Sequence, residues 1–420
     1  MPRHAVSLPE LAHAASRRLA AARHARSLRR HDLRRRLLTG LLGVAIFLVS
    51  SLGFAYAELQ GNIGRHDIDD LVGTDRPTRA GQNSDDPPED PQAGEPLNIL
   101  VMGSDERTED EAAQEGVEGM RSDTTMIAHV SADRSRVEVV SIPRDTIVEI
   151  PSCTLPDGTE TAPQYQARFN SAFATGGSTG DPATAAACTI KTVEQMTGVF
   201  IDDFVVVDFA GFENVVDALD GVPMYIPEAV DDPRAHLQLE QGCQVLGGEE
   251  ALGYARARYS LGDGSDISRI ERQQKLVAAI AREALSVQLL TNVPRLYRFL
   301  DASTSTLTTG EWLGEIPTMA GLAASLRGIR PSEIRFATMP FVPQGATVSP
   351  APEAEQMWEN LHNDRPIDAD LTGTGEEPTE ESSEDASETA TEEETTEEET
   401  SEEPDDQTAT EEETTPECTR

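Results

Sequence analysis

Basic residues are few in this chain: 420 residues include 34 Lys and Arg against 75 Asp and Glu, giving a formal net charge of −41. Because so acidic a surface repels the phosphates of DNA and RNA, the composition excludes nucleic acid as a partner. Histidine is also scarce, and the 8 that occur show no metal-ligand spacing. No Ser/His/Asp or Cys/His arrangement that would mark a catalytic nucleophile stands out either.

Cysteine is equally rare. Cys153, Cys188 and Cys243 lie in the part of the chain that looks folded, whereas Cys418 lies in the acidic tail. Four cysteines suit an exported protein, in which disulfides persist. We expect Cys153 to pair with Cys188, which leaves Cys243 free or paired elsewhere; isolated buried thiols are the alternative, because sequence alone does not fix the pairing.

One segment, Leu37 to Ala57, has no charged residue at all. About 20 apolar residues in a helix cross a bilayer, so we expect a transmembrane helix here. Residues 1–36 carry ten Arg against two acidic residues, and the positive-inside rule therefore places the N-terminus in the cytoplasm and everything after Glu58 outside. The sequence Ala55-Tyr56-Ala57 also has the small-x-small form of a signal-peptide cleavage site, but the long apolar run and the long basic region favour an uncleaved anchor.

Two further segments lack the apolar residues of a folded core. Residues 58–95 are rich in Asp, Pro and Gly, which is typical of an extracellular linker. Residues 367–420 are dominated by Glu, Thr and Ser, and we expect an acidic disordered tail because so little apolar surface cannot offset the entropy of ordering. A single domain, residues 96–366, lies between them, and its motifs are concentrated in residues 96–285.

Within this domain, short apolar runs alternate with segments of helical spacing. We expect strands at residues 97–102, 125–130, 137–142, 204–207 and 334–338, with the second and third forming a hairpin. We expect helices at residues 183–197, 211–219, 248–257, 266–288, 293–302, 311–326 and 353–362. This pattern predicts an α/β fold, an α-β-α sandwich with helices on both faces of a mixed central sheet.

Charged residues follow three of the expected strands. Asp105 comes just after the first strand, Asp123 just before the second, and Arg144 just after the third. Open α/β sheets bind ligands at their strand ends, so these side chains are candidates for one site. Mg²⁺ prefers a few carboxylates together with phosphate oxygens, and we assign Asp105 and Asp123 to the metal side of such a site.

Arginine, scarce elsewhere, is concentrated in the segment Ala255-Arg-Ala-Arg258 and in the following Asp266 to Lys275. Arg presents a fork of donors that matches phosphate oxygens two at a time. In a helix beginning at Asp266, Arg269, Arg272 and Gln273 fall on one face, which predicts a site for a multiply charged anion such as pyrophosphate. Arg272 could instead lie on the solvated side of the helix.

Seven segments in order resemble the LytR-CpsA-Psr family, over roughly residues 96 to 285: Asn98 to Asp105, Arg121 to Thr124, Val140 to Asp145, Phe169 to Ala172, Val207 to Phe212, Ala251 to Arg258 and Arg269 to Gln274. The resemblance implies a membrane-anchored, Mg²⁺-dependent phosphotransferase. Such an enzyme moves a glycopolymer from an undecaprenyl-pyrophosphate carrier to a cell-wall acceptor, forming a phosphodiester with peptidoglycan. The alternatives are a non-enzymatic envelope protein that binds glycans or regulates, and an enzyme that uses a protein acceptor or hydrolyses the lipid pyrophosphate.

The resemblance also implies residue roles. The catalytic set is Asp105, Asp123, Arg144, Arg256 and Arg258. The set that binds the pyrophosphate and lipid carrier is Arg121, Arg144, Arg168, Arg256, Arg258, Asp266, Arg269 and Gln273. Relatives usually have Asp-Phe-Gly-Arg where this chain has Asp266-Ile-Ser-Arg269, so the local backbone and the lipid contact here are expected to differ while the charges are retained.

Overall fold

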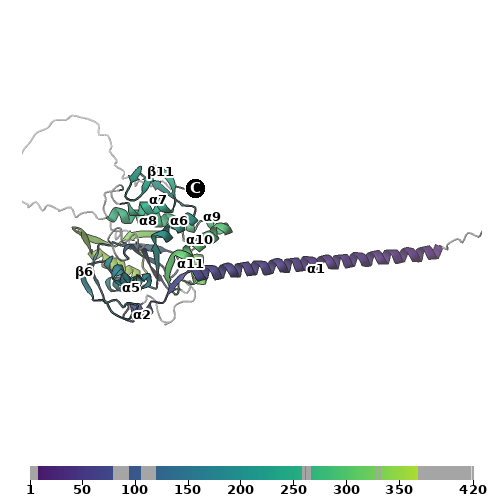
Figure 1. Cartoon of the computed structure of the whole chain (residues 1–420), viewed down its shortest axis with the longest axis horizontal. Helices are drawn as coiled ribbons and strands as arrows, with labels where there is room; N and C mark the ends of the chain where they lie inside the picture. Colours follow the sequence, from purple (N-terminus) through teal and green to yellow (C-terminus); the bar gives the residue numbers. More distant parts are fainter. Residues whose placement is uncertain are drawn as a thin grey trace, which may run out of the picture. The chain divides into compact units, whose positions relative to one another are not determined.

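The computed structural model describes residues 8–78, 94–105, 120–257, 261, 266–326, 329–330, 333–367 and 418, with only the backbone for residues 8–34 and 266. The chain divides into two compact units, residues 1–61 and residues 62–420 (Figure 1). The first unit is made almost entirely of helix α1 (Leu8–Asn62). Among the described residues, the part of α1 from Arg35 to Asn62 is the one helix long and apolar enough to cross a membrane.

In the second unit, the described residues form a seven-stranded mixed sheet in the order β1-β12-β7-β2-β3-β4-β13. These strands are β1 (Gly64–His66), β2 (Leu97–Ser104), β3 (Ser122–Val130), β4 (Val137–Ile142), β7 (Asp203–Asp208), β12 (Leu307–Gly310) and β13 (Ile334–Thr338). Strands β2, β4, β7 and β13 run in one direction, and β1, β3 and β12 run in the other. We call the edge where the first four strands end the carboxyl edge, and the opposite edge the amino edge.

The two faces of this sheet bury different side chains, because successive residues of a strand point to opposite sides. Leu100 and Met102 belong to a core cluster shared with α5 (Pro182–Thr197) and α12 (Pro352–His362). Ile99 and Val101 face a second cluster shared with α11 (Ile316–Ser325). Helices therefore cover both faces, and the predicted α-β-α sandwich is confirmed.

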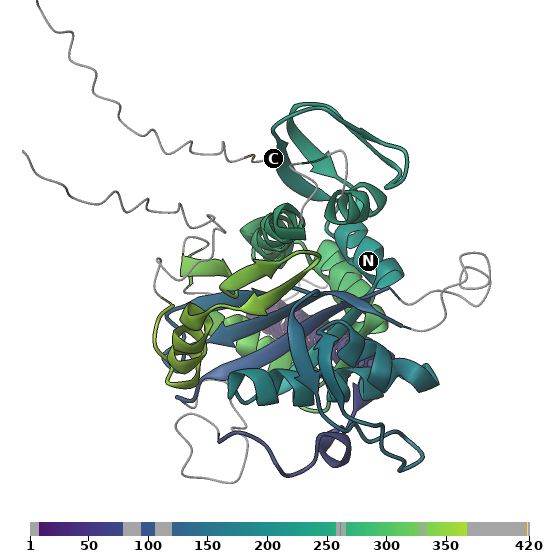
Figure 2. The ribbon, with the colours of Figure 1, turned by 90° about the vertical axis from the view of Figure 1, so that its left-hand side faces the viewer.

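A third cluster joins helices and short hairpins beyond the sheet. It involves α6 (Phe209–Ala218), α7 (Gly248–Arg256), α8 (Asp266–Ala284), α9 (Val287–Thr291), α10 (Val293–Thr306), β8 (Val222–Ile226), β9 (Val230–Asp232), β10 (Leu237–Leu239) and β11 (Gly242–Leu246). Helices α6 and α7 pack so closely that a Cβ on Gly248 would lie 2.5 Å from the carbonyl oxygen of Glu213. Figures 1 and 2 show α6, α7 and α8 together at the end of the domain that carries β11. The remaining elements are α2 (Asp69–Val72), α4 (Ser171–Gly176), β5 (Ile147–Ile150), β6 (Gln164–Arg168), β14 (Phe341–Gln344) and β15 (Thr347–Pro350).

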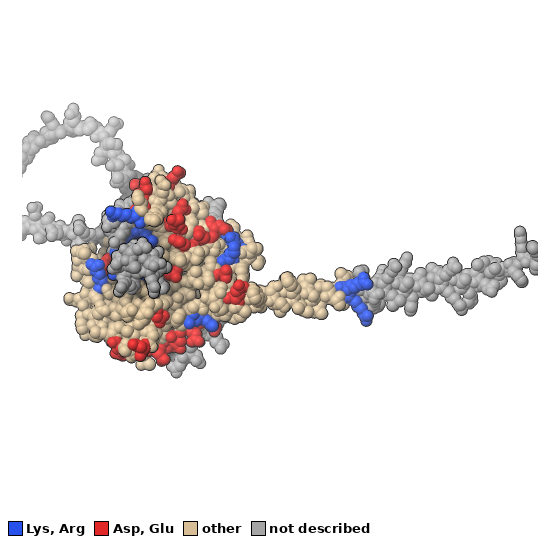
Figure 3. All heavy atoms as spheres, in the orientation of Figure 1, with Lys and Arg blue, Asp and Glu red and all other residues tan. Residues whose placement is uncertain are grey.

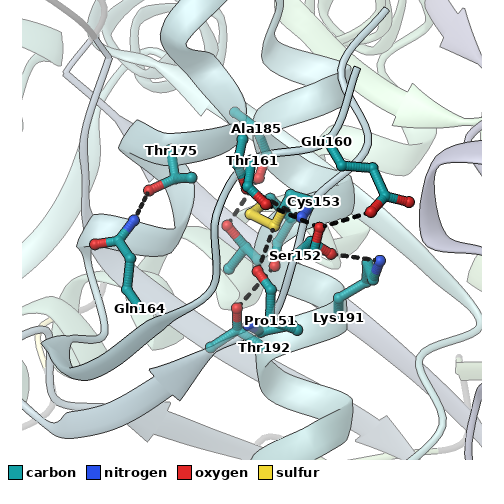
Figure 4. Close-up of a disulfide and its surroundings, with 12 residues drawn as sticks. Pro151, Ser152, Cys153, Glu160, Thr161, Gln164, Thr175, Ala185, Lys191 and Thr192 are labelled. Carbon is teal, nitrogen blue, oxygen red and sulfur yellow. Dashed lines mark hydrogen bonds between the residues drawn. A yellow bond between two sulfur atoms is a disulfide. The ribbon is translucent and has the colours of Figure 1, made fainter. Parts of the chain in front are cut away.

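Two disulfides join the four cysteines. Cys153 pairs with Cys188, as predicted, and this bond ties the loop after β5 to α5 (Figure 4). Around it, the amine of Lys191 donates to the carbonyl oxygen of Ser152 at 2.7 Å, and the Cys153 N–H donates to the hydroxyl of Thr161 at 3.1 Å. The other disulfide joins Cys243 of β11 to Cys418, a pairing that the sequence left open.

The strands and helices expected in the domain occur, with shifted boundaries. The helix expected from residue 311 begins at Ile316, and the helix expected to reach residue 288 ends at Ala284 before α9 begins. The helix expected to end at residue 302 reaches Thr306, and the strand expected from residue 125 begins at Ser122. Part of the expected linker is ordered, because Gly64–His66 adds a parallel strand to β12 at the edge of the central sheet. Apart from Cys418, the expected acidic tail after Ile367 lies outside the described residues.

Candidate active site

The predicted acidic and basic residues that follow the strands meet at the carboxyl edge. Asp105 directly follows β2, and Arg144 comes two residues after β4. Asp123 lies near the start of β3, which runs the opposite way and so begins at this same edge. Side chains from three adjacent strands can therefore act on one ligand, as is usual at the carboxyl ends of open α/β sheets.

A β-bulge sets the position of Asp123. Gly103 of β2 pairs with Thr124 and Ser104 pairs with Ser122, so Asp123 lies between these pairs without a partner in the ladder. Bulges of this kind redirect a side chain and are common next to active sites. The Asp123 side chain is 42% exposed.

Asp105 is held differently. Its carboxylate accepts a hydrogen bond from the N–H of Arg121 at 2.7 Å, and its own N–H donates to the carbonyl oxygen of Arg121 at 2.9 Å. The residue is buried. The two predicted metal ligands thus lie on either side of the same β2–β3 irregularity, Asp105 buried and Asp123 partly exposed.

Arg144 lies between two carboxylates. Its guanidinium donates to Asp123 at 2.8 Å and to Asp145 at 3.4 Å, and Arg168 forms an ion pair with the other oxygen of Asp145 at 3.0 Å. The Arg144 backbone is fixed as well, because its carbonyl oxygen accepts from the N–H of Asn170 at 3.1 Å. Acidic and basic groups alternate here, so an arriving anion would compete with carboxylates for the arginines.

Arg256, at the last residue of α7, is placed by α6. Its guanidinium lies over the ring of Phe209, 4.7 Å from the centroid, which is a cation–π distance. Phe209 begins α6 immediately after Asp208, which pairs with Ser104 at the carboxyl edge. Burial, together with Glu249 and Asp217, raises the pKa of the Glu213 carboxyl, while the charge of Arg256 lowers it.

Helix α8 carries Arg269 and Gln273, one turn apart and both buried. The Gln273 amide donates to the carbonyl oxygen of Ala255 at 3.4 Å, which joins α8 to α7 next to Arg256. Helix α8 is tied to the carboxyl edge of the sheet by Gln274, which the sequence did not single out.

The amide nitrogen of Gln274 donates to the Ser141 hydroxyl at 2.9 Å, to the Ala337 carbonyl oxygen at 2.9 Å and to the Thr338 hydroxyl at 3.2 Å. It thereby fastens α8 to the ends of β4 and β13. The partner in β4, Ser141, comes three residues before Arg144. In the sequence, the only signal for Gln274 was its place in the arginine-rich segment. Its partners become apparent only from the sheet topology.

Arg272 does not lie on the solvated side of the helix, as one alternative predicted. It is buried rather than solvated, and its guanidinium donates to the carbonyl oxygens of Ala257 and Leu261, the latter at 3.1 Å. These bonds brace the segment after α7. Arg272 therefore contributes to the site by holding backbone in place.

Two predicted site residues have no described side chain. Arg258 lies outside the described residues, and Asp266 is described only as the first backbone position of α8. The exposed Arg121 lies at the carboxyl edge, where its main chain is hydrogen-bonded to Asp105.

The donor set at the carboxyl edge suits one kind of metal site. Among residues with described side chains, no three or more His, Cys, Asp or Glu are grouped so that they could hold a metal ion by themselves. Mg²⁺ is usually bound by one or two carboxylates and completes its shell with phosphate oxygens and water. Asp105 and Asp123 are the two carboxylates at this edge that could hold a Mg²⁺ ion together with phosphate oxygens of a substrate.

A cavity of about 1050 Å³ lies at the amino edge of the sheet. Six carboxylates, two basic residues and three aromatic rings line it: Asp67, Asp69, Asp202, Asp203, Glu311, Glu315, His66, Arg76, Phe200, Phe204 and Trp312. Burial raises the pKa of Asp203 to about 6, against hydrogen bonds from the N–H groups of Leu313, Phe204 and Gly310. None of the predicted site residues lines this cavity, and its acidity would repel a pyrophosphate.

Comparison with known proteins gives consistent matches. Residues 56–363 match the family described as LytR_cpsA_psr. The chain is 33% identical over 239 residues to "Probable cell wall biosynthesis protein LcpB" of Corynebacterium glutamicum, covering 55% of this chain and 52% of that protein. It is 28% identical over 324 residues to "Cell wall biosynthesis protein LcpA" of the same organism, covering 73% and 59%. It is 30% identical over 256 residues to "Polyisoprenyl-teichoic acid--peptidoglycan teichoic acid transferase TagU" of Halalkalibacterium halodurans, covering 61% and 71%.

The matched region thus spans between half and three fifths of the two Corynebacterium proteins. Among solved structures, TagV of B. subtilis superposes with a TM-score of 0.50 at 24% identity, over 65% of this chain and 99% of that one. A LytR-Csp2A-Psr enzyme from Actinomyces oris gives a TM-score of 0.50 at 20% identity, over 72% and 96%. At these identities the structural matches establish the fold.

Proposed function

Because the chain belongs to the LytR-CpsA-Psr family, we propose that it is a membrane-anchored phosphotransferase. Its donor is a glycopolymer on an undecaprenyl-pyrophosphate carrier, and its acceptor is a hydroxyl of peptidoglycan. The observation that carries this proposal is Arg144, held between Asp123 and Asp145 at the carboxyl edge. The name of the TagU relative, a polyisoprenyl-teichoic acid–peptidoglycan transferase, describes a reaction of this class.

In the proposed reaction, the acceptor oxygen attacks the phosphorus that bears the glycan. The bond between that phosphorus and the bridging oxygen of the pyrophosphate breaks, and undecaprenyl phosphate leaves with the electron pair. The product is a phosphodiester between glycan and acceptor. Catalysis of such a step consists mainly of positioning and charge stabilisation, which requires fixed cations rather than a protein nucleophile.

The arginines supply those cations from two directions. In the proposal, Arg144 and Arg168 bind the anion from the sheet side, and Arg256 on α7 and Arg269 on α8 bind it from the helices. In the proposal, the diphosphate displaces Asp123 and Asp145 from the arginine forks and is held in several bidentate contacts. Arg121, Arg258, Asp266 and Gln273 complete the binding set; the roles of Arg258 and Asp266 rest on their motif positions alone.

The displaced carboxylates then become available. Asp123, released from Arg144, or Asp105 would accept the proton of the attacking hydroxyl, because both lie at the edge where the acceptor must enter. When bound, Mg²⁺ would add positive charge at the phosphate oxygens through these two carboxylates.

The same proposal includes the location of the domain. The cluster of Arg before residue 37 favours a cytoplasmic N-terminus with the domain outside. Two disulfides support an exported domain, since disulfides persist in oxidising compartments.

The full-length protein should be tested in proteoliposomes with a lipid-pyrophosphate-linked glycan, Mg²⁺ and peptidoglycan. We expect undecaprenyl phosphate to be released and glycan to appear on peptidoglycan, and Arg144→Ala to abolish both. Arg330→Ala is a matched control, because Arg330 is exposed and pairs with Glu333. Free glycan phosphate would instead indicate hydrolysis, glycan on a protein would indicate another acceptor, and binding without product would favour a non-enzymatic role.

A further inference from the structure

Exposed apolar side chains gather where α8, α9 and α10 meet. They are Leu285, Val287, Leu290, Val293 and Leu300, which we call the corner patch. Val287 and Val293 are 70% and 73% exposed, high values for aliphatic residues of a folded domain. Val293 and Leu300 are seven positions apart on α10 and so share one face of that helix. An apolar group of this kind on a folded domain marks an interaction surface.

The segment that carries the corner patch has no acidic residue of its own. Residues 284–300 contain two Arg and no Asp or Glu, in a chain with 75 acidic residues. Figure 3 shows Asp and Glu spread over the visible face of the domain, with Lys and Arg in a few places. Arg298 is 59% exposed, and the exposed Arg282 lies in the last turn of α8.

Two of the carboxylates next to the patch are paired with arginines. Glu283 accepts from Arg295 at 3.0 Å, and Asp220 forms ion pairs with Arg295 at 2.8 Å and with Arg298 at 3.6 Å. Arg282 and Arg298 are exposed at the border of the patch and present the cations that could meet lipid phosphates.

The domain begins beside the same helix. Asn62, its first residue, donates from the side-chain amide to the carboxylate of Asp301 in α10 at 3.1 Å. Asn62 comes five residues after Ala57, the end of the charge-free segment. Five extended residues span at most roughly 18 Å, so α10 cannot lie far from the bilayer into which residues 37–57 insert. Val293 and Asp301 are eight residues apart, about 12 Å along the helix.

We propose that the corner patch docks on the surface of an anionic phospholipid bilayer. Its apolar side chains enter the boundary between headgroups and acyl chains, while Arg282 and Arg298 contact lipid phosphates. This contact would hold the domain at a fixed height and orientation above the membrane. It requires the membrane anchor and is independent of the transferase activity.

The test uses full-length protein in phosphatidylglycerol proteoliposomes with brominated acyl chains, which quench tryptophan on contact. Val287→Trp and Val293→Trp each add a reporter, read as a difference from the parent protein with its native Trp312 and Trp358. Val342→Trp on β14 is the matched control, because Val342 is a 48% exposed valine elsewhere on the domain. We expect the corner reporters to lose a large part of their emission and the Val342 reporter to keep it. Equal quenching at all three positions overturns the proposal.

The role of charge and the competing occupant are tested in the same system. Arg282→Gln combined with Arg298→Gln should weaken quenching of the Val287 reporter, as should replacement of phosphatidylglycerol by phosphatidylcholine. A second copy of the chain would instead shift the corner reporters to shorter wavelength in detergent, with no quenching by brominated lipid. That result would overturn membrane docking.

Discussion

Arg144 and Asp123 form a 2.8 Å ion pair from neighbouring strands, although Asp123 is skipped by the ladder that joins β2 to β3. The bulge exposes the carboxylate while Arg144, fixed through Asn170, meets it from β4. A pair that is built on fixed backbone but is partly open to solvent can be separated by a ligand at modest cost. This property distinguishes it from a fully buried ion pair, in which separation would leave an uncompensated buried charge.

Replacing Arg144 should impair turnover far more than folding. Loss of one fixed charge-stabilising donor typically lowers kcat by about 10² to 10³. Arg144→Lys should recover only part of the rate, because a lysine ammonium lacks the bidentate fork. The measurement is steady-state transfer of glycan with the thermal unfolding midpoint alongside it. If Arg144→Lys restores full activity, the proposed bidentate contact is wrong.

Removal of divalent cations should stop the reaction, and Asp123→Asn should weaken the response to Mg²⁺. A neutral amide is a poorer ligand than a carboxylate, so the Mg²⁺ concentration for half-maximal rate should rise. The titration is made after treatment with EDTA, with Asp231→Asn as the control because Asp231 is exposed on β9. An unchanged rate in EDTA would remove Mg²⁺ from the proposal.

Gln274→Ala should loosen α8 from the ends of β4 and β13. It leaves the Ser141 and Thr338 hydroxyls and the Ala337 carbonyl without this partner, at a cost of about 1–3 kcal/mol in the free energy of unfolding. Because Arg269 is on the same helix, KM for the lipid-linked donor should also rise. Lys275→Ala is the control, since Lys275 is the exposed next residue. A variant with lowered stability but unchanged KM would limit Gln274 to a structural role.

Asp203 should make the domain less stable as pH rises. Burial raises its pKa to about 6 from an ordinary value of 3.8, so between these values the folded protein keeps a proton that the unfolded chain has released. Stability therefore falls across pH 4 to 6, by up to about 3 kcal/mol from this group, and stays at the lower level above pH 6. The stability of Asp203→Asn relative to the parent should rise through the same window. Chemical denaturation in detergent at several pH values measures this, and a pH-independent difference would contradict it.

Removing the Cys153–Cys188 disulfide should destabilise the fold. Both cysteines are buried in the core shared by the sheet and α5, so Cys153→Ala with Cys188→Ala should cost about 2–5 kcal/mol. The unfolding midpoint of the double variant is compared with that of Cys243→Ala with Cys418→Ala, which leaves this core intact. An unchanged midpoint for the first double variant would show that the bond is dispensable.

Local pattern predicted much of this fold because the signals were strong. The helix after Asp181 was expected at residues 183–197 and is found at Pro182–Thr197, where Asp181 caps its start and Gly198 ends it in a left-handed conformation. The short apolar runs of β2, β3 and β4 also indicated strands. In contrast, β1 is three residues long and has no apolar pattern, so only its pairing with β12, more than 240 positions away, makes it a strand.

The site residues also divide into those that local pattern predicts and those that depend on distant contacts. Asp105, Asp123 and Arg144 were predictable because each is next to a clear strand, and their convergence follows from the strand directions. The role of Arg272 was not, because helix periodicity gives its face but not the carbonyl groups of Ala257 and Leu261 that meet it there. The Cys243–Cys418 pairing likewise depends on contacts 175 positions apart in the chain.

That second disulfide has a consequence for proteolysis. The bond between Cys243 and Cys418 closes a covalent ring of the chain from residue 243 to residue 418. The acidic stretch between residues 367 and 418 is part of this ring. A single cut anywhere in that stretch would release nothing. The nicked protein would keep its full mass on a non-reducing gel and would separate into two fragments only after reduction.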